Sequence, residues 1–233
     1  MSLLTLVQSA TDKIGLTRPS VIYASTDQQV RELLSFSNQE GVELARAHPW
    51  QEITKEKTFT CTAAAAQTGA FASDYDRIVN DSMFNRTAKR KVIGPIGAQE
   101  WQERQAYTTA SGLNSWFRLR GDSLLMTPTP NGTDTIAYEY ISTQWCESSG
   151  GTDQSAWAAD TDVGLLDENL MALGVVWRWL KANGFPIWEL AYKEYQAQVA
   201  QAAARQMGAP ILNIGQRTAP YLRPNIPEAS FGP

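Results

Sequence analysis

The sequence has few of the side chains on which metal sites and nucleophilic catalysis depend. It contains one histidine, His48, and two cysteines, Cys61 and Cys146, which are too far apart for a metal-binding spacing or a disulfide framework. A catalytic histidine needs a further group to orient it, and the sequence marks no such group beside His48. We therefore predict that the chain is not an enzyme and has no cofactor or metal, and that His48 ends a helix before Pro49.

Phosphate-binding loops and long apolar runs are also missing. No GxxxxGK[ST] or GxGxxG pattern occurs, and the Gly-Pro-Ile-Gly run at residues 94–97 is interpreted as a turn. No segment approaches the roughly 18–20 consecutive apolar residues that cross a bilayer. The residues after Met1 lack the basic region of a signal peptide, so we predict synthesis in the cytoplasm and no membrane partner.

An excess of positive charge is absent. The chain has 20 Lys and Arg against 24 Asp and Glu, which argues against a dedicated nucleic-acid binder, because such proteins displace phosphate counterions with clustered cations. The one basic cluster lies within residues 86–91. It is either a solvated loop or a contact for DNA or an acidic partner, and the side chains concerned are Arg86, Lys89, Arg90 and Lys91.

Three aspartates, Asp74, Asp76 and Asp81, come close together in the sequence around Tyr75. Paired carboxylates perform acid–base catalysis only where a pocket separates their two pKa values. Their neighbours are those of a polar turn, and we interpret them so. The Arg-Gly-Asp tripeptide at residues 120–122 is likewise interpreted as a hairpin turn.

Helical periodicity is strongest towards the two ends of the sequence. Apolar residues at helical spacing predict helices over residues 3–14, ended by Gly15, and 26–48, capped by the Thr26 hydroxyl. A buried central helix is predicted over residues 162–182, with Asp162 as its cap. Pro186 is expected to open a last helix, whose Ala-rich second half allows a neighbouring helix to approach closely.

The middle of the sequence has the period of β-strands. Residues 115–120 and 123–127 flank the predicted turn, residues 135–142 alternate, and a short helix is expected near residues 98–107. The predicted fold is therefore α+β, an antiparallel helical bundle core with an inserted small antiparallel β module and an extended C-terminal arm. The helical core takes residues 1–50 and 160–208, the β module residues 51–146, a linker loop residues 147–159, and the arm residues 209–233.

The predicted arm, residues 209–233, contains five prolines with isolated apolar residues between them. Such a segment cannot form a helix or a packed sheet by itself. Two interpretations stand: a plain terminus, or an arm that becomes ordered on a partner. The second is favoured by the number of large apolar side chains, which exceeds that of a solvated tail.

An ordered series of short motifs runs through residues 1–205. In their order these motifs resemble the head-to-tail adaptor proteins of tailed bacteriophages, also called head completion or connector proteins. The stretches concerned are Leu3 to Val7, Ile14-Gly15, Thr26-Asp27 with Val30 to Leu34, Gly41 to Ala45 with His48 to Trp50, Asp74 to Asn80 with Asn85 to Thr87, and Leu170 to Gly184 followed by Tyr192 and Tyr195.

The resemblance implies a virion protein at the head–tail interface. Copies would form a dodecameric ring under the portal protein, extend the channel for the genomic DNA without sequence-specific binding, and offer the opposite face to tail or nozzle proteins. An acidic chain suits such a conduit, because a strongly basic one would hold the duplex. The arm would reach the portal, with expected contacts at Ile211, Tyr221, Arg223, Ile226 and Phe231.

Other functions remain open at this point. The chain could be a different phage part, such as a tail completion protein or tail-tube terminator. It could also be a glycan-binding or hydrolytic module built on the aromatic-rich β region. That reading predicts a groove with exposed Trp116, Trp145 and Trp157 beside paired carboxylates. A nucleic-acid regulator is the last alternative.

Overall fold

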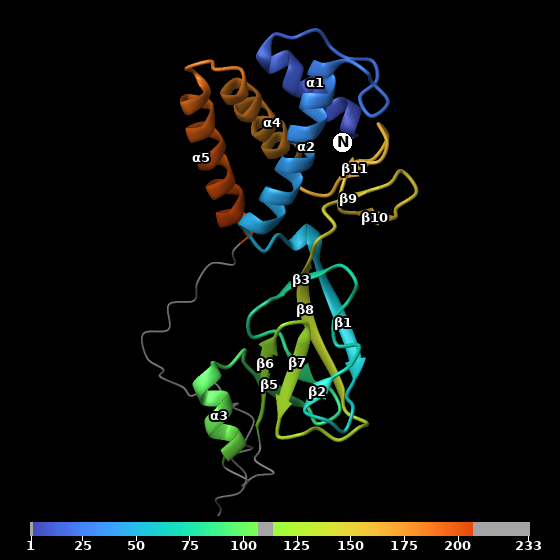
Figure 1. Cartoon of the computed structure of the whole chain (residues 1–233), viewed down its shortest axis with the longest axis vertical. Helices are drawn as coiled ribbons and strands as arrows, with labels where there is room; N and C mark the ends of the chain where they lie inside the picture. Colours follow the sequence, from blue (N-terminus) through green and yellow to red (C-terminus); the bar gives the residue numbers. More distant parts are fainter. Residues whose placement is uncertain (1, 107–113, 207–233) are drawn as a thin grey trace, which may run out of the picture.

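Four helices gather at one end of the molecule and a large sheet lies at the other (Figure 1). The computed structural model describes residues 2–106 and 114–206. The helices at the first end are α1 (Leu3–Ile14), α2 (Gln28–Ala47), α4 (Glu168–Ala182) and α5 (Trp188–Gln206), and α3 (Ala98–Ala106) lies beside the sheet. A short 3-10 turn, Gln51–Ile53, leads from α2 into the first strand.

The predicted helix ends are confirmed at α1 and α2. Gly15 ends α1 in the left-handed conformation, with φ of 80°, which glycine adopts without steric cost. His48 is the C-cap of α2, as predicted, and its ring packs edge-on against Trp50 at 5.0 Å.

Two predicted N-caps are wrong, by one residue at α2 and by five residues at α4. The cap of α2 is Asp27 and not Thr26, because the Asp27 carboxylate accepts the Gln29 N–H. The cap of α4 is Asp167 and not Asp162. Asp162 is buried and accepts two loop N–H groups instead, from Ala158 and Ala159. Each stretch offers two acceptors, and only the backbone path decides which of them reaches the helix start.

Helix α4 is central, as its apolar circumference predicts. It packs against α1, α2 and α5, and eight of its residues are buried. Helix α5 differs, because Tyr195 is its one buried residue. The helical end therefore consists of a firmly packed group, α1, α2 and α4, with α5 attached to its flank.

The larger sheet has eight strands. Its order is β1-β8-β4-β5-β6-β7-β2, with β3 also paired to β8, so β8 contacts β1 along one edge and β3 and β4 along the other. Six pairings are antiparallel, whereas β5 and β6 run parallel. The strands are β1 (Thr54–Thr60), β2 (Ala66–Gln67), β3 (Tyr75–Ile78), β4 (Phe84–Asn85), β5 (Arg90–Ile93), β6 (Ser115–Arg120), β7 (Ser123–Thr127) and β8 (Thr135–Ser142).

The predicted fold class is wrong. The protein is a mixed α/β molecule with a large curled sheet of eight strands, and not a helical bundle core with a small antiparallel β module (Figure 1). Strands β2 and β4 are two residues long and β5 begins in the basic cluster, so none of them carries an alternating apolar pattern. Their membership of the sheet comes from pairing with distant strands. The predicted arm lies outside the described residues.

A second, three-stranded sheet follows β8. It consists of β9 (Cys146–Glu147), β10 (Asp153–Gln154) and β11 (Val163–Gly164) in the order β10-β9-β11. Residues 147–159, predicted as a linker loop, contain β10 and the buried indole of Trp157. That indole packs edge-on against Trp145 at 5.1 Å.

The buried side chains form two main cores. One joins α1, α2 and α4 to the small sheet through Trp145 and Trp157, and the other lies within the large sheet around Phe117 and Tyr138. The first depends on a close approach at Gly41. A Cβ atom there would lie 2.4 Å from the ring of Trp145, so only glycine lets this indole rest on α2.

Candidate functional sites

The basic cluster lies on an exposed hairpin between β4 and β5. Arg86 forms an ion pair with Glu56 at 2.7 Å, and the side chain of Asn85 accepts the Ala88 N–H within the turn. Asn85 also donates to Asp134 at 2.9 Å, which ties the hairpin to the start of β8. The structure thus brings the predicted contact residues together on one hydrogen-bonded turn. All of them are exposed: Arg86, Lys89, Arg90 and Lys91.

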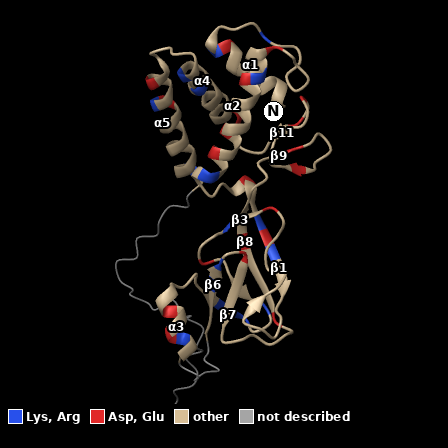
Figure 2. Cartoon of the chain, in the orientation of Figure 1, with Lys and Arg blue, Asp and Glu red and all other residues tan. Residues whose placement is uncertain are grey.

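The predicted portal contacts cannot be placed in this way. Ile211, Tyr221, Arg223, Ile226 and Phe231 lie outside the described residues. Charges of both signs are interspersed over the described elements at both ends of the molecule (Figure 2). A dedicated nucleic-acid binder instead carries its Lys and Arg residues clustered together.

The aspartates near Tyr75 are structural groups. Asp74 accepts hydrogen bonds from Lys55, Tyr140 and Ser142 at 2.7–2.9 Å. Burial raises the pKa of this carboxyl, but the three hydrogen bonds outweigh burial and hold the pKa at about 2. Asp76 is paired with the neighbouring Arg77. These contacts hold β3 against β1 and β8, and they do not form a carboxylate pair with separated pKa values.

The three tryptophans of the glycan-binding reading lie apart. Trp145 and Trp157 are buried in the core of the helical end, 0% and 4% exposed. Trp116 belongs to β6, where the Arg104 guanidinium lies 3.7 Å above its ring. No groove joins the three, so the described structure removes the observation on which a glycan site would rest.

A buried polar network, missed at the sequence level, joins α2, α4 and α5. Glu40 is fully buried and forms an ion pair with Arg178, which is 5% exposed. Tyr195 donates its hydroxyl to Glu40 at 2.7 Å, and Arg178 also reaches the half-exposed Glu43 at 2.6 Å. The sequence did hold a signal, because Glu40 falls on the apolar stripe of α2 between Ser37 and Leu44.

Gly174 makes the network possible. A Cβ atom at this position would lie 2.0 Å from the Glu40 carboxyl carbon, and the Gly174 carbonyl accepts a hydrogen bond from Arg178 at 2.9 Å. Burial raises the pKa of Glu40 to about 7, against the opposing effects of Arg178 and Tyr195. Through Tyr195, the one buried residue of α5, the network forms the buried polar attachment of this helix, while Gln206 forms an exposed one with Gln51 and Glu52.

Stability is expected to depend on the titration of Glu40. Between pH 4.5 and about 7 the folded protein keeps a proton that the unfolded chain has released. The stability that this group contributes is therefore lost as the pH rises through that window, and the loss ends above about pH 7. Urea unfolding of the wild type and of Glu40→Gln at several pH values measures the difference. A difference that stays constant from pH 4.5 to 7 would contradict a raised pKa.

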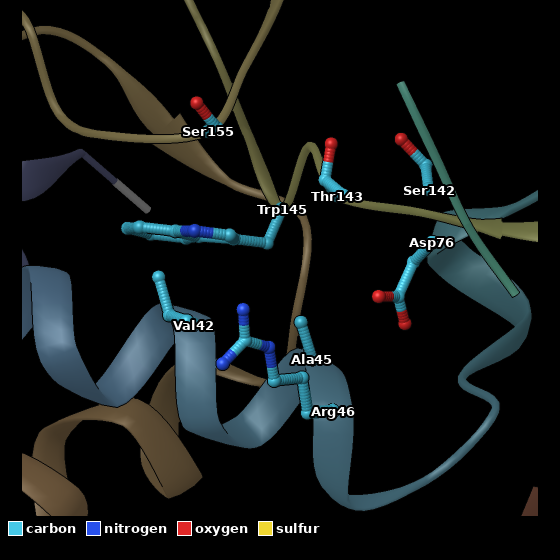
Figure 3. A pocket seen from close by; sticks show the side chains of 8 residues that line it. All are labelled: Val42, Ala45, Arg46, Asp76, Ser142, Thr143, Trp145 and Ser155. Atoms are coloured by element: carbon cyan, nitrogen blue, oxygen red, sulfur yellow. The ribbon is translucent and has the colours of Figure 1, made fainter. Parts of the chain in front are cut away.

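A cleft lies where the helical end meets the sheet. Its volume is about 250 Å³, and α2 contributes Val42, Ala45 and Arg46 to its wall. Figure 3 shows the Arg46 guanidinium turned towards the indole of Trp145, with Asp76 across the cleft. The other lining residues are Ser142, Thr143 and Ser155.

Large exposed apolar side chains lie at the extremity of the helical end, away from the large sheet. Phe185, Ile187 and Leu190 lie at the turn from α4 to α5, and Val21 and Tyr23 lie in the connection from α1 to α2. Both connections are at the end of the molecule remote from the large sheet (Figure 1). Exposed apolar side chains in such number are typical of protein contact surfaces.

The described residues hold no metal cluster, no membrane-spanning helix and no reactive thiol. In residues 2–106 and 114–206, no three His, Cys, Asp or Glu side chains are placed to hold a metal ion. None of the helices in those ranges is long and apolar enough to span a membrane. Burial raises the pKa of the Cys61 thiol to about 11 and that of Cys146 to about 12, so both stay in the unreactive thiol form at neutral pH.

Comparison with known protein families gives a match over almost the whole chain. The model of a protein family described as SU10 adaptor protein matches residues 1–227 of the chain. The match covers both the helical end and the sheet, and it extends beyond the described residues. No curated protein matches the sequence.

Proposed function

The chain belongs to the SU10 adaptor protein family, whose members are structural phage proteins, and on this premise we propose that it forms a ring between the portal and the tail. The ring would be a dodecamer, as in the head-to-tail adaptors that the sequence resembles. It would extend the DNA channel and carry the tail or nozzle protein. The observation that carries the proposal is the family match over residues 1–227.

The arrangement of the chain supports this role. The described part has two main cores, one at the helical end and one in the large sheet, so a subunit presents different surfaces at its two extremities. An adaptor needs two such surfaces, because it contacts unlike neighbours above and below. We propose that residues 209–233 contact the portal and that one extremity receives the tail.

The charge of the chain supports a channel that lets DNA pass. The net charge is -4, and the charges of both signs are interspersed (Figure 2). Such a surface makes few phosphate contacts, so it does not retain the duplex. The exposed hairpin with Lys89 is then a local contact for DNA or for an acidic partner surface, without sequence-specific binding.

Ring formation is expected to require the portal. The isolated protein should be largely monomeric at micromolar concentration, because the apolar stripes of α1, α2 and α4 are already buried within one subunit. Light scattering after size-exclusion chromatography measures the free state, and electron microscopy of a mixture with the portal measures assembly. A stable ring without the portal would contradict the templating step. Absence of the protein from portal particles would contradict the adaptor role.

A further inference from the structure

Helix α5 is held to the rest of the molecule by little buried apolar surface. Tyr195 is its one buried residue, and α4 is the helix against which it packs. Val199, Ala202 and Ala203 reach the core with side chains that are only partly buried. A helix with so little buried apolar surface loses little hydrophobic stabilisation when it separates from its neighbours.

Both ends of α5 are weakly fixed. The turn that leads into it from α4, residues 183–187, contains Gly184, whose φ of 72° is in the left-handed region. Hinges consist of a few residues at the end of an element that absorb a change of backbone angles, which glycine does at low cost. At the other end Gln206 forms its hydrogen bonds with Gln51 and Glu52 at the surface, where water can replace them.

The buried contact of α5 is polar. The Tyr195 hydroxyl donates to the carboxyl group of Glu40, which is also paired with Arg178. Burial removes the hydration of both ions, and this loss can exceed their mutual attraction. Separation of α5 would admit water to Glu40, so the hydration that is regained offsets part of the contact that is lost. An apolar contact of the same area has no such offset.

The proton on Glu40 couples this contact to pH. Burial raises the pKa of Glu40 to about 7 and outweighs Arg178 of α4 and Tyr195 of α5, which favour the charged form. Glu43, one turn further along α2, disfavours it. Once water reaches the carboxyl group, its pKa falls towards the ordinary value of 4.5, so separation of α5 releases a proton. A rise of pH through this window therefore favours the separated form.

We propose that α5 is a latch: it opens as one helix about the turn at residues 183–187 while α1, α2 and α4 stay folded, and the contact of Tyr195 with Glu40 holds it closed. Residues 207–233 follow α5 in the chain, so opening moves the point from which they extend. At roughly 1.5 Å per residue, the 19 residues of α5 form a lever about 28 Å long. That this movement serves portal contact rests on the proposed function, whereas the opening itself does not.

Hydrogen–deuterium exchange of the full chain, followed by mass spectrometry between about pH 5 and pH 8, tests the latch. The rates are corrected for the intrinsic effect of pH on amide exchange. At pH 8 we expect the amides of α5 to be protected at least about tenfold less than those of α2 and α4, because they open without global unfolding. The protection of α5 should also fall at least about tenfold from pH 5 to pH 8, since opening releases one proton.

Two variants on α2 give the matched comparison. Glu40→Gln keeps the size of the side chain but does not titrate, so the fall in α5 protection should shrink to less than about twofold. Glu43→Gln changes the half-exposed partner of the same Arg178 and should retain the fall.

Equal protection of α5, α2 and α4 in the wild type would overturn the latch, and this comparison stands even if Glu40→Gln does not fold. A fall that is absent from the wild type, or that persists in Glu40→Gln, would overturn the role of Glu40. Exchange is measured on the isolated chain and ring assembly on the portal, so a failure of either proposal can be recognised.

Discussion

Glu40→Ala is expected to lower the free energy of unfolding by about 3–5 kcal/mol, the largest effect of any single substitution considered for this protein. The change removes the buried partner of Arg178, which is itself 5% exposed, and it also removes the acceptor of the Tyr195 hydroxyl. Desolvated charge and hydroxyl groups then remain without a full set of partners, which is costly in a core. Chemical denaturation followed by circular dichroism measures the loss.

Two matched variants separate this effect from a general loss of side-chain volume. Glu43→Ala removes the half-exposed partner of the same Arg178 and is expected to cost only about 0–1 kcal/mol. Adding Arg178→Met to Glu40→Ala should restore part of the lost stability, because no buried cation then remains. If the double variant is no more stable than Glu40→Ala, an uncompensated charge is not the cause.

Truncation after Gly208 is expected to abolish stable attachment to the portal while leaving the melting temperature nearly unchanged. The two cores of the described part are built from residues between 3 and 203, so truncation removes none of their side chains. Residues 209–233 carry scattered large apolar side chains, and each is worth roughly 1.5–3 kcal/mol when fully removed from water. Five prolines reduce the entropy cost of fixing the segment.

Repetition of the segment around a ring multiplies weak contacts through avidity, so loss of every copy has a large effect. The measurement is the occupancy of the protein on portal particles, determined by electron microscopy, with thermal unfolding as the control for folding. A more conservative variant replaces Tyr221, Ile226 and Phe231 by serine in the full-length chain. Full occupancy of the truncated protein would show that the anchoring surface lies elsewhere, on the helices or the sheet.

The cap of α4 illustrates how far local prediction extends. The apolar positions of the helix are evident from their spacing, and α4 is indeed buried over most of its circumference. The first residue of the helix is not evident from the sequence, because Asp162 and Asp167 both offer a carboxylate that could cap it. Asp162 is drawn instead to the N–H groups of Ala158 and Ala159 in the preceding turn. The periodicity of a helix is a local property, whereas the selection of its cap depends on where the preceding chain is held.

The candidate sites were predictable to different degrees. The basic hairpin with Arg86 and Lys89 could be recognised as a cluster, because neighbours in sequence stay neighbours in a tight turn. The cleft beside Trp145 could not, because α2 and the segment after β8 form its walls and lie about a hundred positions apart in the chain. The position of Glu40 on the apolar stripe of α2 was a signal in the sequence, but the prediction missed it. Nothing in the sequence indicated its partner Arg178, 138 positions away.

Properties that depend on composition or on one short segment followed from the amino-acid sequence alone. They include the helical stop at Gly15, the turn at Gly121, the adaptor resemblance and the lack of an excess of positive charge. The eight-stranded sheet, the contact of Trp145 with Gly41 and the Glu40–Arg178 pair appear only when the folded chain brings distant segments together. The physical reason is that a two-residue strand such as β4 has no period of its own. Its conformation is set by the backbone groups of β5 and β8, to which it pairs.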